Sequence, residues 1–254
     1  MNQPTNAQPD YGNWVSTRLI YAPAVSSLVF LALAFLFPPS IIIAAVFLLV
    51  AAYFVYARRL FSPQGGNVQQ RVWDLLLAHL DWDGQGQALD IGCGNAALTI
   101  AVAGKYPAAR VIGSDYWGGN WEYSKGVCEN NARLAGVADR LSFQKASAAA
   151  LPFDDCDFDA TVSNLCSHEV SDARDKREVI REALRVVRPG GKFAFQDLFL
   201  LEREYGAVED LLATIRSWGI GRVEFVKTCD APFIPRALKL PFMVGTMGLI
   251  RGEK

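Results

Sequence analysis

The chain has no excess of charge of either sign. Its 25 lysines and arginines nearly balance 26 aspartates and glutamates over 254 residues, so the formal net charge is −1. A protein that binds the phosphate backbone of a nucleic acid needs a basic surface that neutralises several phosphates at once. The charge balance therefore predicts no nucleic-acid partner.

Cysteine is scarce and has no diagnostic spacing. The five cysteines are an odd number, and no two form a C-x-x-C pair: Cys93, Cys128, Cys156, Cys166 and Cys229. Disulfide frameworks and structural zinc sites both depend on patterned cysteines. The sequence predicts neither of them and no metal site, and free thiols are typical of a reducing, cytoplasmic compartment.

Apolar residues are abundant, at 51% of the chain, and gather near its beginning. Residues 19–37 and 41–57 contain no charged side chain, and only Pro38-Pro39-Ser40 separates the two runs. As helices they would be roughly 28 and 25 Å long, close to the hydrocarbon thickness of about 30 Å. We expect a transmembrane helical hairpin. A hairpin that dips into one leaflet and two helices on the membrane surface stay open as alternatives.

Basic residues flank this predicted hairpin on one side only. Arg18 precedes the first run, Arg58 and Arg59 follow the second, and the turn carries no positive charge. The positive-inside rule then places the rest of the chain in the cytoplasm. The predicted organisation is a mostly disordered tail (1–17), a two-helix membrane anchor (18–59), a linker (60–67) and a globular domain (68–254).

In the globular region, short apolar runs alternate with helical patterns. The strand candidates are 88–91, 110–114, 141–145, 159–163, 192–196, 223–228 and 247–251, and the helix candidates are 96–105, 119–135 and 172–188. This alternation predicts an α/β fold, a parallel sheet with helices on both faces. Ligands of such sheets bind at the carboxyl ends of the strands.

The strongest motif, LDIGCGNA (89–96), lies between a predicted strand and a predicted helix. Its glycines allow a sharp turn and a close approach of the backbone to a ligand. Asp115 ends the next strand, where a carboxylate suits the two hydroxyls of a ribose. A nicotinamide-binding fold shares these features, but Ala97 stands where its third glycine is expected.

With three further motifs, the region 68–254 resembles the class I S-adenosylmethionine-dependent methyltransferases. The further motifs are GSDYW (113–117), ASAAALPFDDCDFD (146–159) and RVVRPGGKF (185–193). The resemblance implies a Rossmann-like fold with a seven-stranded sheet whose last strand is antiparallel. It also implies S-adenosylmethionine as the cofactor and methyl transfer as the activity.

The resemblance implies a role for each residue that matches a motif. Asp90 and the loop Gly92, Cys93, Gly94 and Asn95 would bind the methionine end of the cofactor. Asp115 would hold the ribose, with Tyr116 or Trp117 beside the adenine in an aromatic cluster that includes Trp121 and Tyr123. Ser147 and Ala148 would lie near the adenine amino group, although many relatives have an acidic residue in place of Ser147. Asn164 would lie beside the transferred methyl group.

One of only two histidines, His168, follows the fourth predicted strand. An imidazole with a pKa of about 6.5 is a natural proton acceptor for a thiol, phenol or hydroxyl nucleophile. We predict a catalytic role for His168 with Asn164, although a packing role stays open. His79, on a short amphipathic helix, is expected to be structural.

The predicted function is a membrane-anchored methyltransferase that acts on a small apolar or lipid-like acceptor. A hydrophobic thiol, a quinone or isoprenoid precursor and a phospholipid head group remain possible acceptors. The alternative is a noncatalytic membrane scaffold that keeps the methyltransferase fold. Besides the lipid bilayer, a second copy of the chain is a possible partner through Ala44, Ala45, Ala51 and Ala52.

Overall fold

The computed structural model describes residues 8–118 and 123–254. Residues 1–7 of the predicted tail and Trp121 of the predicted aromatic cluster lie outside the described residues. The described residues divide into two compact units, Gly12–Val72 and the remainder, in which the described residues before Gly12 join those after Val72. Each unit is described by itself.

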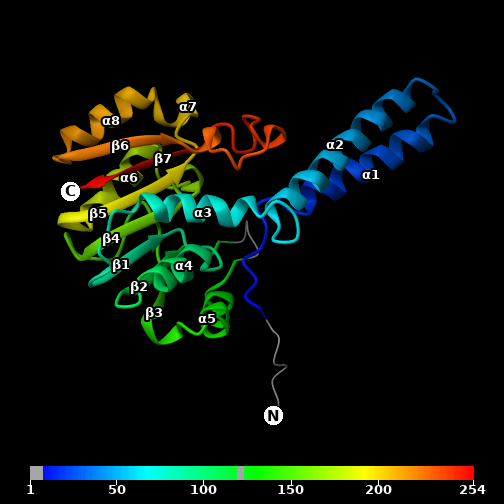
Figure 1. The fold of residues 1–254 in the computed structure, drawn as a ribbon. Coiled ribbons are helices and arrows are strands. Elements are labelled where there is room, and N and C mark those ends of the chain that lie inside the picture. Colours follow the sequence, from blue (N-terminus) through cyan, green and yellow to red (C-terminus); the bar gives the residue numbers. More distant parts are fainter. Residues whose placement is uncertain (1–7, 119–122) are drawn as a thin grey trace, which may run out of the picture. The chain divides into compact units, whose positions relative to one another are not determined.

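The larger unit contains a seven-stranded sheet in the order β3-β2-β1-β4-β5-β7-β6 (Figure 1). Its strands are β1 (Gln87–Ile91), β2 (Arg110–Asp115), β3 (Leu141–Lys145), β4 (Phe158–Asn164), β5 (Val187–Asp197), β6 (Arg222–Lys227) and β7 (Gly248–Glu253). The first five are parallel to one another, whereas β7 is antiparallel to both β5 and β6. The predicted α/β sheet with an antiparallel last strand is therefore confirmed.

Helices cover both faces of the sheet. The helices are α3 (Val68–His79), α4 (Ala97–Lys105), α5 (Lys125–Leu134), α6 (Lys176–Arg185), α7 (Glu202–Tyr205) and α8 (Val208–Ser217). Leu89 and Ile91 of β1 pack in one core cluster with residues of α6 and α8. Asp90, between them, bonds to Thr99 of α4. Because successive strand side chains point to opposite faces, α4 lies across the sheet from α6 and α8.

Several boundaries differ from the sequence prediction. The Pro189-Gly190-Gly191 turn was expected to precede the fifth strand, but it lies within β5, which begins at Val187. The ladder shifts register there, between the pairs that Phe158 and Ala160 make with β5, and Gly190 has a φ of 76°. The strand can therefore start early because the extra residues bulge out of the ladder. Helices α7 and α8 were not predicted.

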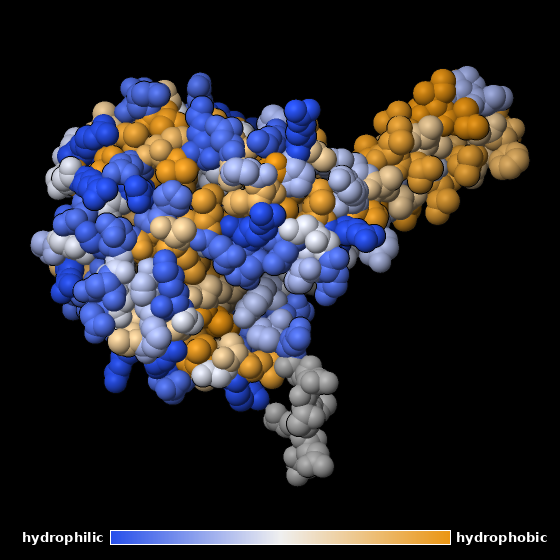
Figure 2. All heavy atoms as spheres, in the orientation of Figure 1, coloured by the Kyte–Doolittle hydropathy of each residue, from blue (hydrophilic) through white to orange (hydrophobic). Residues whose placement is uncertain are grey.

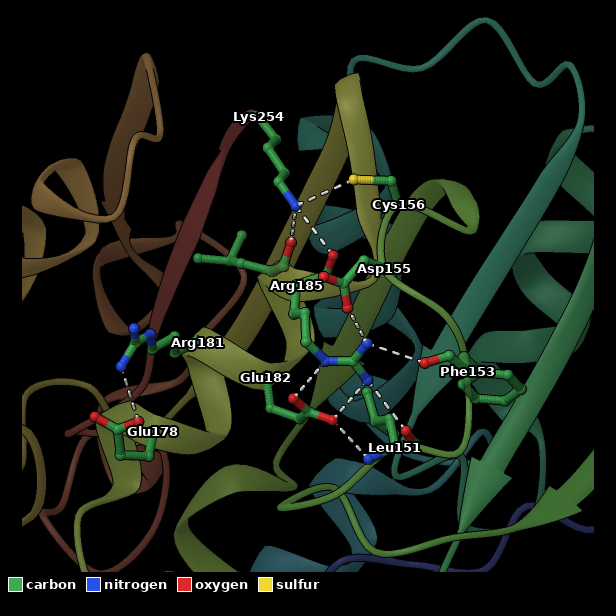
Figure 3. Close-up of polar contacts among 10 residues, drawn as sticks. Leu151, Phe153, Asp155, Cys156, Glu178, Arg181, Glu182, Arg185 and Lys254 are labelled. Carbon is green, nitrogen blue, oxygen red and sulfur yellow. Dashed lines mark hydrogen bonds and ion pairs between the residues drawn. The ribbon is translucent and has the colours of Figure 1, made fainter.

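An arginine fixes the loop that joins β3 to β4 (Figure 3). Arg185, in the last turn of α6, donates hydrogen bonds to the carbonyl oxygens of Leu151 and Phe153. The same guanidinium pairs with Glu182 at 2.8 Å and with Asp155 at 2.6 Å. The side chain of Lys254 donates to the carbonyl oxygens of Leu184 and Arg185, which satisfies the end of α6.

The smaller unit is a pair of helices, α1 (Arg18–Leu33) and α2 (Ser40–Phe61), that lie side by side (Figure 1). The Ser27 hydroxyl donates to the carbonyl oxygen of Ala44 at 2.8 Å, and the rings of Phe30 and Phe47 stack at 5.6 Å. Large apolar side chains cover the outside of the pair, as the orange spheres of Figure 2 show. Within the described residues, α2 is the one helix long and apolar enough to cross a membrane.

Two sequence predictions for this unit need adjustment. The first helix has 16 residues and ends at Leu33, so it is shorter than the predicted run of 19–37 and does not reach membrane-spanning length. Residues of the predicted tail also have partners. The backbone N–H of Trp14 donates to Gln69 at 3.2 Å, and its ring packs on Phe61 at 5.5 Å. Apolar runs in a sequence predict helices, but they do not reveal polar contacts such as the hydrogen bond between Trp14 and Gln69.

Candidate active site

The loop after β1 turns sharply at glycine. Gly92 and Gly94 have φ angles of 74° and 55°, which favour glycine, and Ala96 also adopts a positive φ of 67°. The backbone N–H groups of Gly92 and Cys93 donate to the carbonyl oxygen of Ser114 at 2.8 and 3.0 Å. These bonds hold the loop against the end of β2. The predicted role of the glycines in a tight strand-to-helix turn fits this geometry.

Asp115 joins the loops after β1 and β2. Its Oδ2 accepts a hydrogen bond from the backbone N–H of Gly94 at 2.9 Å, and its Oδ1 accepts one from that of Trp117 at 2.7 Å. The Trp117 indole donates back to the carbonyl oxygen of Gly94 at 3.1 Å. Burial raises the pKa of Asp115, although these N–H donors lower it in part. Each carboxylate oxygen keeps lone-pair capacity for a further donor.

Two buried side chains, one at the end of β1 and one in the loop after it, carry an acceptor without a partner among the described residues. Asp90 accepts from the Thr99 hydroxyl at 2.6 Å through Oδ2, while its Oδ1 has no hydrogen-bond partner among the described residues. Burial raises the pKa of Asp90 to about 7. The Oδ1 atom of Asn95 is also buried and has no donor in the described part of the chain. Unpaired buried acceptors are costly and indicate a missing donor.

Cys93, predicted to contact the cofactor, is buried below the loop in a cluster with Ile100, Cys128 and Phe143. Burial raises the pKa of its thiol well above the usual value, so the group stays protonated and unreactive. The Cys128 thiol lies 3.0 Å from the carbonyl oxygen of Gly94. The side chain of Cys93 therefore supports the loop from its inner side.

Of the residues predicted near the adenine, Tyr116 is 63% exposed and its ring lies 5.1 Å from the Lys145 ammonium. The Ser147 hydroxyl donates to Asp172 at 2.6 Å, and Ala148 is buried in the main core cluster. Asp172 thus brings a carboxylate to Ser147, where the family resemblance implies an acidic residue in many members. The sequence analysis missed Asp172 because it is 25 residues further along the chain.

Asn164, at the carboxyl end of β4, is half-buried and joins a polar chain whose other members, Gln196 and Thr228, are buried. Its Oδ1 accepts from the side-chain amide of Gln196 at 2.9 Å, and the Gln196 carbonyl accepts from the Thr228 hydroxyl at 3.0 Å. Leu165 follows with a positive φ of 54°, and its N–H donates to the carbonyl oxygen of Gln196. A non-glycine residue in this conformation is strained, and such strain concentrates at functional sites.

His168 pairs with an aspartate that the sequence analysis did not single out. Its Nδ1 lies 2.6 Å from Oδ1 of Asp197, the last residue of β5, and its Nε2 lies 3.8 Å from Glu169. Asp197 could have been found by the same rule that drew attention to Asp115, because both end a parallel strand. Over residues 8–118 and 123–254, no group of three His, Cys, Asp or Glu side chains could hold a metal ion.

A family model for a methyltransferase domain matches residues 89–195, which hold the glycine loop, Asp115 and His168. This part of the chain therefore resembles a methyltransferase domain. The domain resembles the 27-O-demethylrifamycin SV methyltransferase of Amycolatopsis mediterranei, with 32% identity over 158 residues. These residues are 61% of this chain and 54% of that protein. A demethylmenaquinone methyltransferase of Clavibacter sepedonicus is 33% identical over 104 residues, 41% of this chain and 38% of that protein.

Solved structures share the fold of the methyltransferase domain. The cyclase SpnF aligns with a TM-score of 0.55 and 22% identity over 74% of this chain and 81% of its own. A geranyl diphosphate methyltransferase in complex with SAM aligns with a TM-score of 0.52 and 15% identity. The alignment covers 77% of this chain and 93% of that chain. The family match supports S-adenosylmethionine as the cofactor. The chain spans about half the length of the first curated relative that it matches.

The residues of the site fit this cofactor. S-adenosylmethionine carries an ammonium group and two ribose hydroxyls, all hydrogen-bond donors. The unpaired acceptors of Asp90 and Asn95 and the open lone pairs of Asp115 are the complementary groups. Glycine at 92 and 94 leaves the backbone beside them free of side chains. This region therefore has acceptors that match the donors of the cofactor.

Proposed function

We propose that the chain is a membrane-anchored methyltransferase that uses S-adenosylmethionine and acts on a small apolar or lipid-like acceptor. The observation that supports methyl transfer most strongly is the Asp115 carboxylate, held by the N–H groups of Gly94 and Trp117 beside the glycine loop. Asp90, Gly92, Gly94 and Asn95 would hold the methionine end, and Cys93 would support their loop. Tyr116, Trp117, Ser147 and Ala148 would form the adenine end, and Asn164 would lie near the methyl group.

When bound, the cofactor supplies a methyl group that is already activated on a sulfonium. The residues of the chain must then position the acceptor in line with the methyl group and exclude water. Half-buried Asn164 and buried Gln196 and Thr228 give the carboxyl ends of β4 and β5 a polar frame for this alignment.

The membrane part of the proposal rests on α2. Its 22 residues contain no charged side chain before Arg58, and Leu49 near its centre is 71% exposed. An exposed apolar helix of this length is unusual in water and suits a bilayer. Two similar proteins are named as methyltransferases of 27-O-demethylrifamycin SV and of demethylmenaquinone, and we propose an acceptor of comparable apolar character. Arg58 and Arg59, the basic residues in the last turn of α2, favour a cytoplasmic location for the catalytic domain.

Cofactor binding tests the catalytic part. We would titrate S-adenosylhomocysteine into the detergent-solubilised full chain by calorimetry, beside Asp115→Ala and the surface control Asp210→Ala. We expect binding by the wild type and by Asp210→Ala, and loss of at least about tenfold in affinity for Asp115→Ala. A folded wild type that does not bind would contradict the proposal and favour the noncatalytic scaffold.

Vesicle flotation tests the membrane part. The wild type should float with phosphatidylcholine–phosphatidylglycerol vesicles and resist extraction by carbonate. An arginine near the centre of a spanning helix costs about 2.5–3.5 kcal/mol on insertion. Leu49→Arg should therefore release a substantial fraction of the protein, whereas Leu49→Met should not. A wild type that binds S-adenosylhomocysteine but stays with the soluble fraction would overturn the anchoring alone. A second copy of the chain as partner would be detected in the same samples by cross-linking.

A further inference from the structure

His168 and Asp197 form a fixed acid–base pair. The His168 Nδ1 lies 2.6 Å from Oδ1 of Asp197, and the side chain of Asp197 is only 2% exposed. Backbone N–H groups hold both carboxylate oxygens: Ser167 donates to Oδ2 at 2.8 Å, and Leu198 donates to Oδ1 at 2.7 Å. Donors on both oxygens stabilise the ionised carboxylate. An ionised Asp197 requires a proton on Nδ1, which leaves Nε2 of the neutral ring as the acceptor.

The pair lies beside the glycine loop. Cys166, two residues before His168, is so close to Gly92 that a Cβ atom on the glycine would be 2.5 Å from its sulfur. Tyr123 connects the same two regions. Its ring would be 3.5 Å from a Cβ atom on Gly94, and burial and the nearby Glu169 charge raise its pKa to about 12. His168 is 22% exposed, so its ring is not sealed in the core.

Among the titratable groups around it, the His168 imidazole is the one suited to accept a proton from a substrate. Burial lowers the pKa of His168, but the hydrogen bond to Asp197 and the charges of Asp197, Glu169 and Glu204 outweigh burial and raise it. Burial raises the pKa values of Cys166 and Tyr205 well above their usual ranges, so both neighbours keep their protons at neutral pH. Carboxylates are much weaker bases than imidazole.

We propose that Nε2 of His168 accepts the proton of the methyl acceptor, that Asp197 is the positioning residue for this imidazole, and that the acceptor is a hydroxyl, phenol or thiol. This inference rests on the proposed methyl transfer. The acceptor O–H or S–H bond breaks, and its proton moves to Nε2. The electron pair left behind forms the bond to the methyl carbon, and the pair of the broken carbon–sulfur bond goes to sulfur. The imidazolium, paired with Asp197, later releases its proton to solvent.

The first test reads the imidazole directly and needs no acceptor. The chain has only two histidines, so the ring nitrogens of ¹⁵N-histidine-labelled protein give two sets of NMR signals, which His79→Gln assigns. We expect His168 to be the Nδ1–H tautomer, to titrate at higher pH than a free histidine, and to titrate at lower pH in Asp197→Asn. A midpoint unchanged by Asp197→Asn, or a proton on Nε2 in the neutral ring, would overturn the proposal.

Cofactor binding separates this test from that of the proposed function. S-adenosylhomocysteine should bind wild type, His168→Gln and Asp197→Asn within about threefold. Asp197 is buried, so Asp197→Glu provides a second, ionisable variant if the asparagine variant does not fold, and it should restore part of the raised midpoint. Binding without the expected tautomer contradicts the role of the pair alone, whereas no binding contradicts methyl transfer itself.

The second test compares acceptors of matched apolar size: 4-hexylphenol, 1-decanethiol and decylamine. We expect methylation of the phenol or the thiol to exceed that of the amine. His168→Gln should lower kcat by about 10²–10⁴-fold with little change in KM. In Asp197→Asn, the rise of kcat/KM with pH should move to lower pH. Methylation of the amine above the other two, at equal rates in wild type and His168→Gln, would contradict the proposal.

Discussion

A Cβ atom added to Gly92 would lie 2.5 Å from both Cβ and Sγ of Cys166. The loops after β1 and β4 therefore pack directly against each other at the carboxyl edge of the sheet. Two separate constraints require glycine here, because Gly92 also has a φ of 74°. Since Cys166 precedes the turn that carries His168, this contact couples the shape of the glycine loop to the position of the imidazole.

Gly92→Ala should unfold more easily and lose cofactor binding. The positive φ costs an alanine about 1–2 kcal/mol, and the steric conflict with Cys166 adds about 1–3 kcal/mol. Urea denaturation and calorimetry with S-adenosylhomocysteine would measure both effects. Gly94→Ala is the matched control for the stability measurement alone, because it shares a positive φ but has Tyr123 at 3.5 Å as its nearest neighbour. The double variant Gly92→Ala/Cys166→Gly should regain the stability that the steric conflict costs. If the losses of unfolding free energy of the two single variants simply add in the double variant, the contact is contradicted.

The sequence predicted the sheet well because each strand is a short apolar run between turn signals. Strand β3 was predicted with its observed bounds, and the antiparallel β7 followed from the family resemblance. Helix α8 was missed because its apolar positions were not recognised as a helical pattern. Buried Leu211 and Ile215 lie four residues apart on its inner face.

The sequence predicted part of the site, and the residues that it did not reveal were missed for the same reason. The residues found, such as Asp90 and Asp115, stand next to a strand end within a recognisable motif. Asp172 and Asp197 act through partners 25 and 29 residues away in the chain, so local patterns do not reveal the pairs. The contacts of Asp10 with Asn131 span 121 residues in a segment that was expected to be disordered.

Asn131→Ala should weaken both the loop after β1 and the N-terminal segment. The buried Asn131 amide donates to the carbonyl oxygens of Asp10 and Asn95 at 2.8 and 3.0 Å, and its Oδ1 accepts from the N–H of Asp10 at 3.0 Å. Leaving these groups unpaired should cost about 2–4 kcal/mol. Its neighbour Asn130 is exposed, so Asn130→Ala is the control.

Thermal denaturation and limited proteolysis would measure the effect of Asn131→Ala. The variant should be cut near residue 10 faster than the wild type, and its affinity for S-adenosylhomocysteine should fall because Asn95 loses a support. Equal cleavage rates for Asn130→Ala and Asn131→Ala would show that the side chain does not hold the segment.

Arg185→Ala should destabilise the domain much more than Arg181→Ala, although both arginines lie on α6 (Figure 3). Arg185 bonds to two loop carbonyls and two carboxylates, whereas Arg181 has an exposed ion pair with Glu178 at 3.6 Å and lies 6.0 Å from the centre of the Trp218 ring. We expect a loss of about 2–4 kcal/mol for Arg185→Ala and less than about 1 kcal/mol for Arg181→Ala. Denaturation midpoints of the two variants test this, and similar losses would argue against a structural role of the Arg185 network.

Asp90 should make the protein without cofactor less stable as the pH rises from about 4 to about 7. Burial raises the pKa of Asp90 from 3.8 to about 7. In this range the unfolded chain releases the proton while the folded protein retains it, so the folded state binds more protons and its stability falls with rising pH. The slope is about 1.4 kcal/mol per pH unit for this single group, and it ends where the folded carboxyl ionises.

The free energy of unfolding of wild type relative to Asp90→Asn, measured between about pH 5 and 8, isolates this effect. The unfolding free energy of wild type minus that of Asp90→Asn should fall as the pH rises to about 7 and should then stay constant. Asp175→Asn is the control, because the hydrogen bond to Arg177 lowers the pKa of exposed Asp175, which then titrates below this range. Its difference from wild type should be flat. Thr99→Val, which removes the donor that lowers the pKa of Asp90, should extend the slope to higher pH. A flat difference for Asp90→Asn would mean that the folded protein keeps this carboxylate ionised.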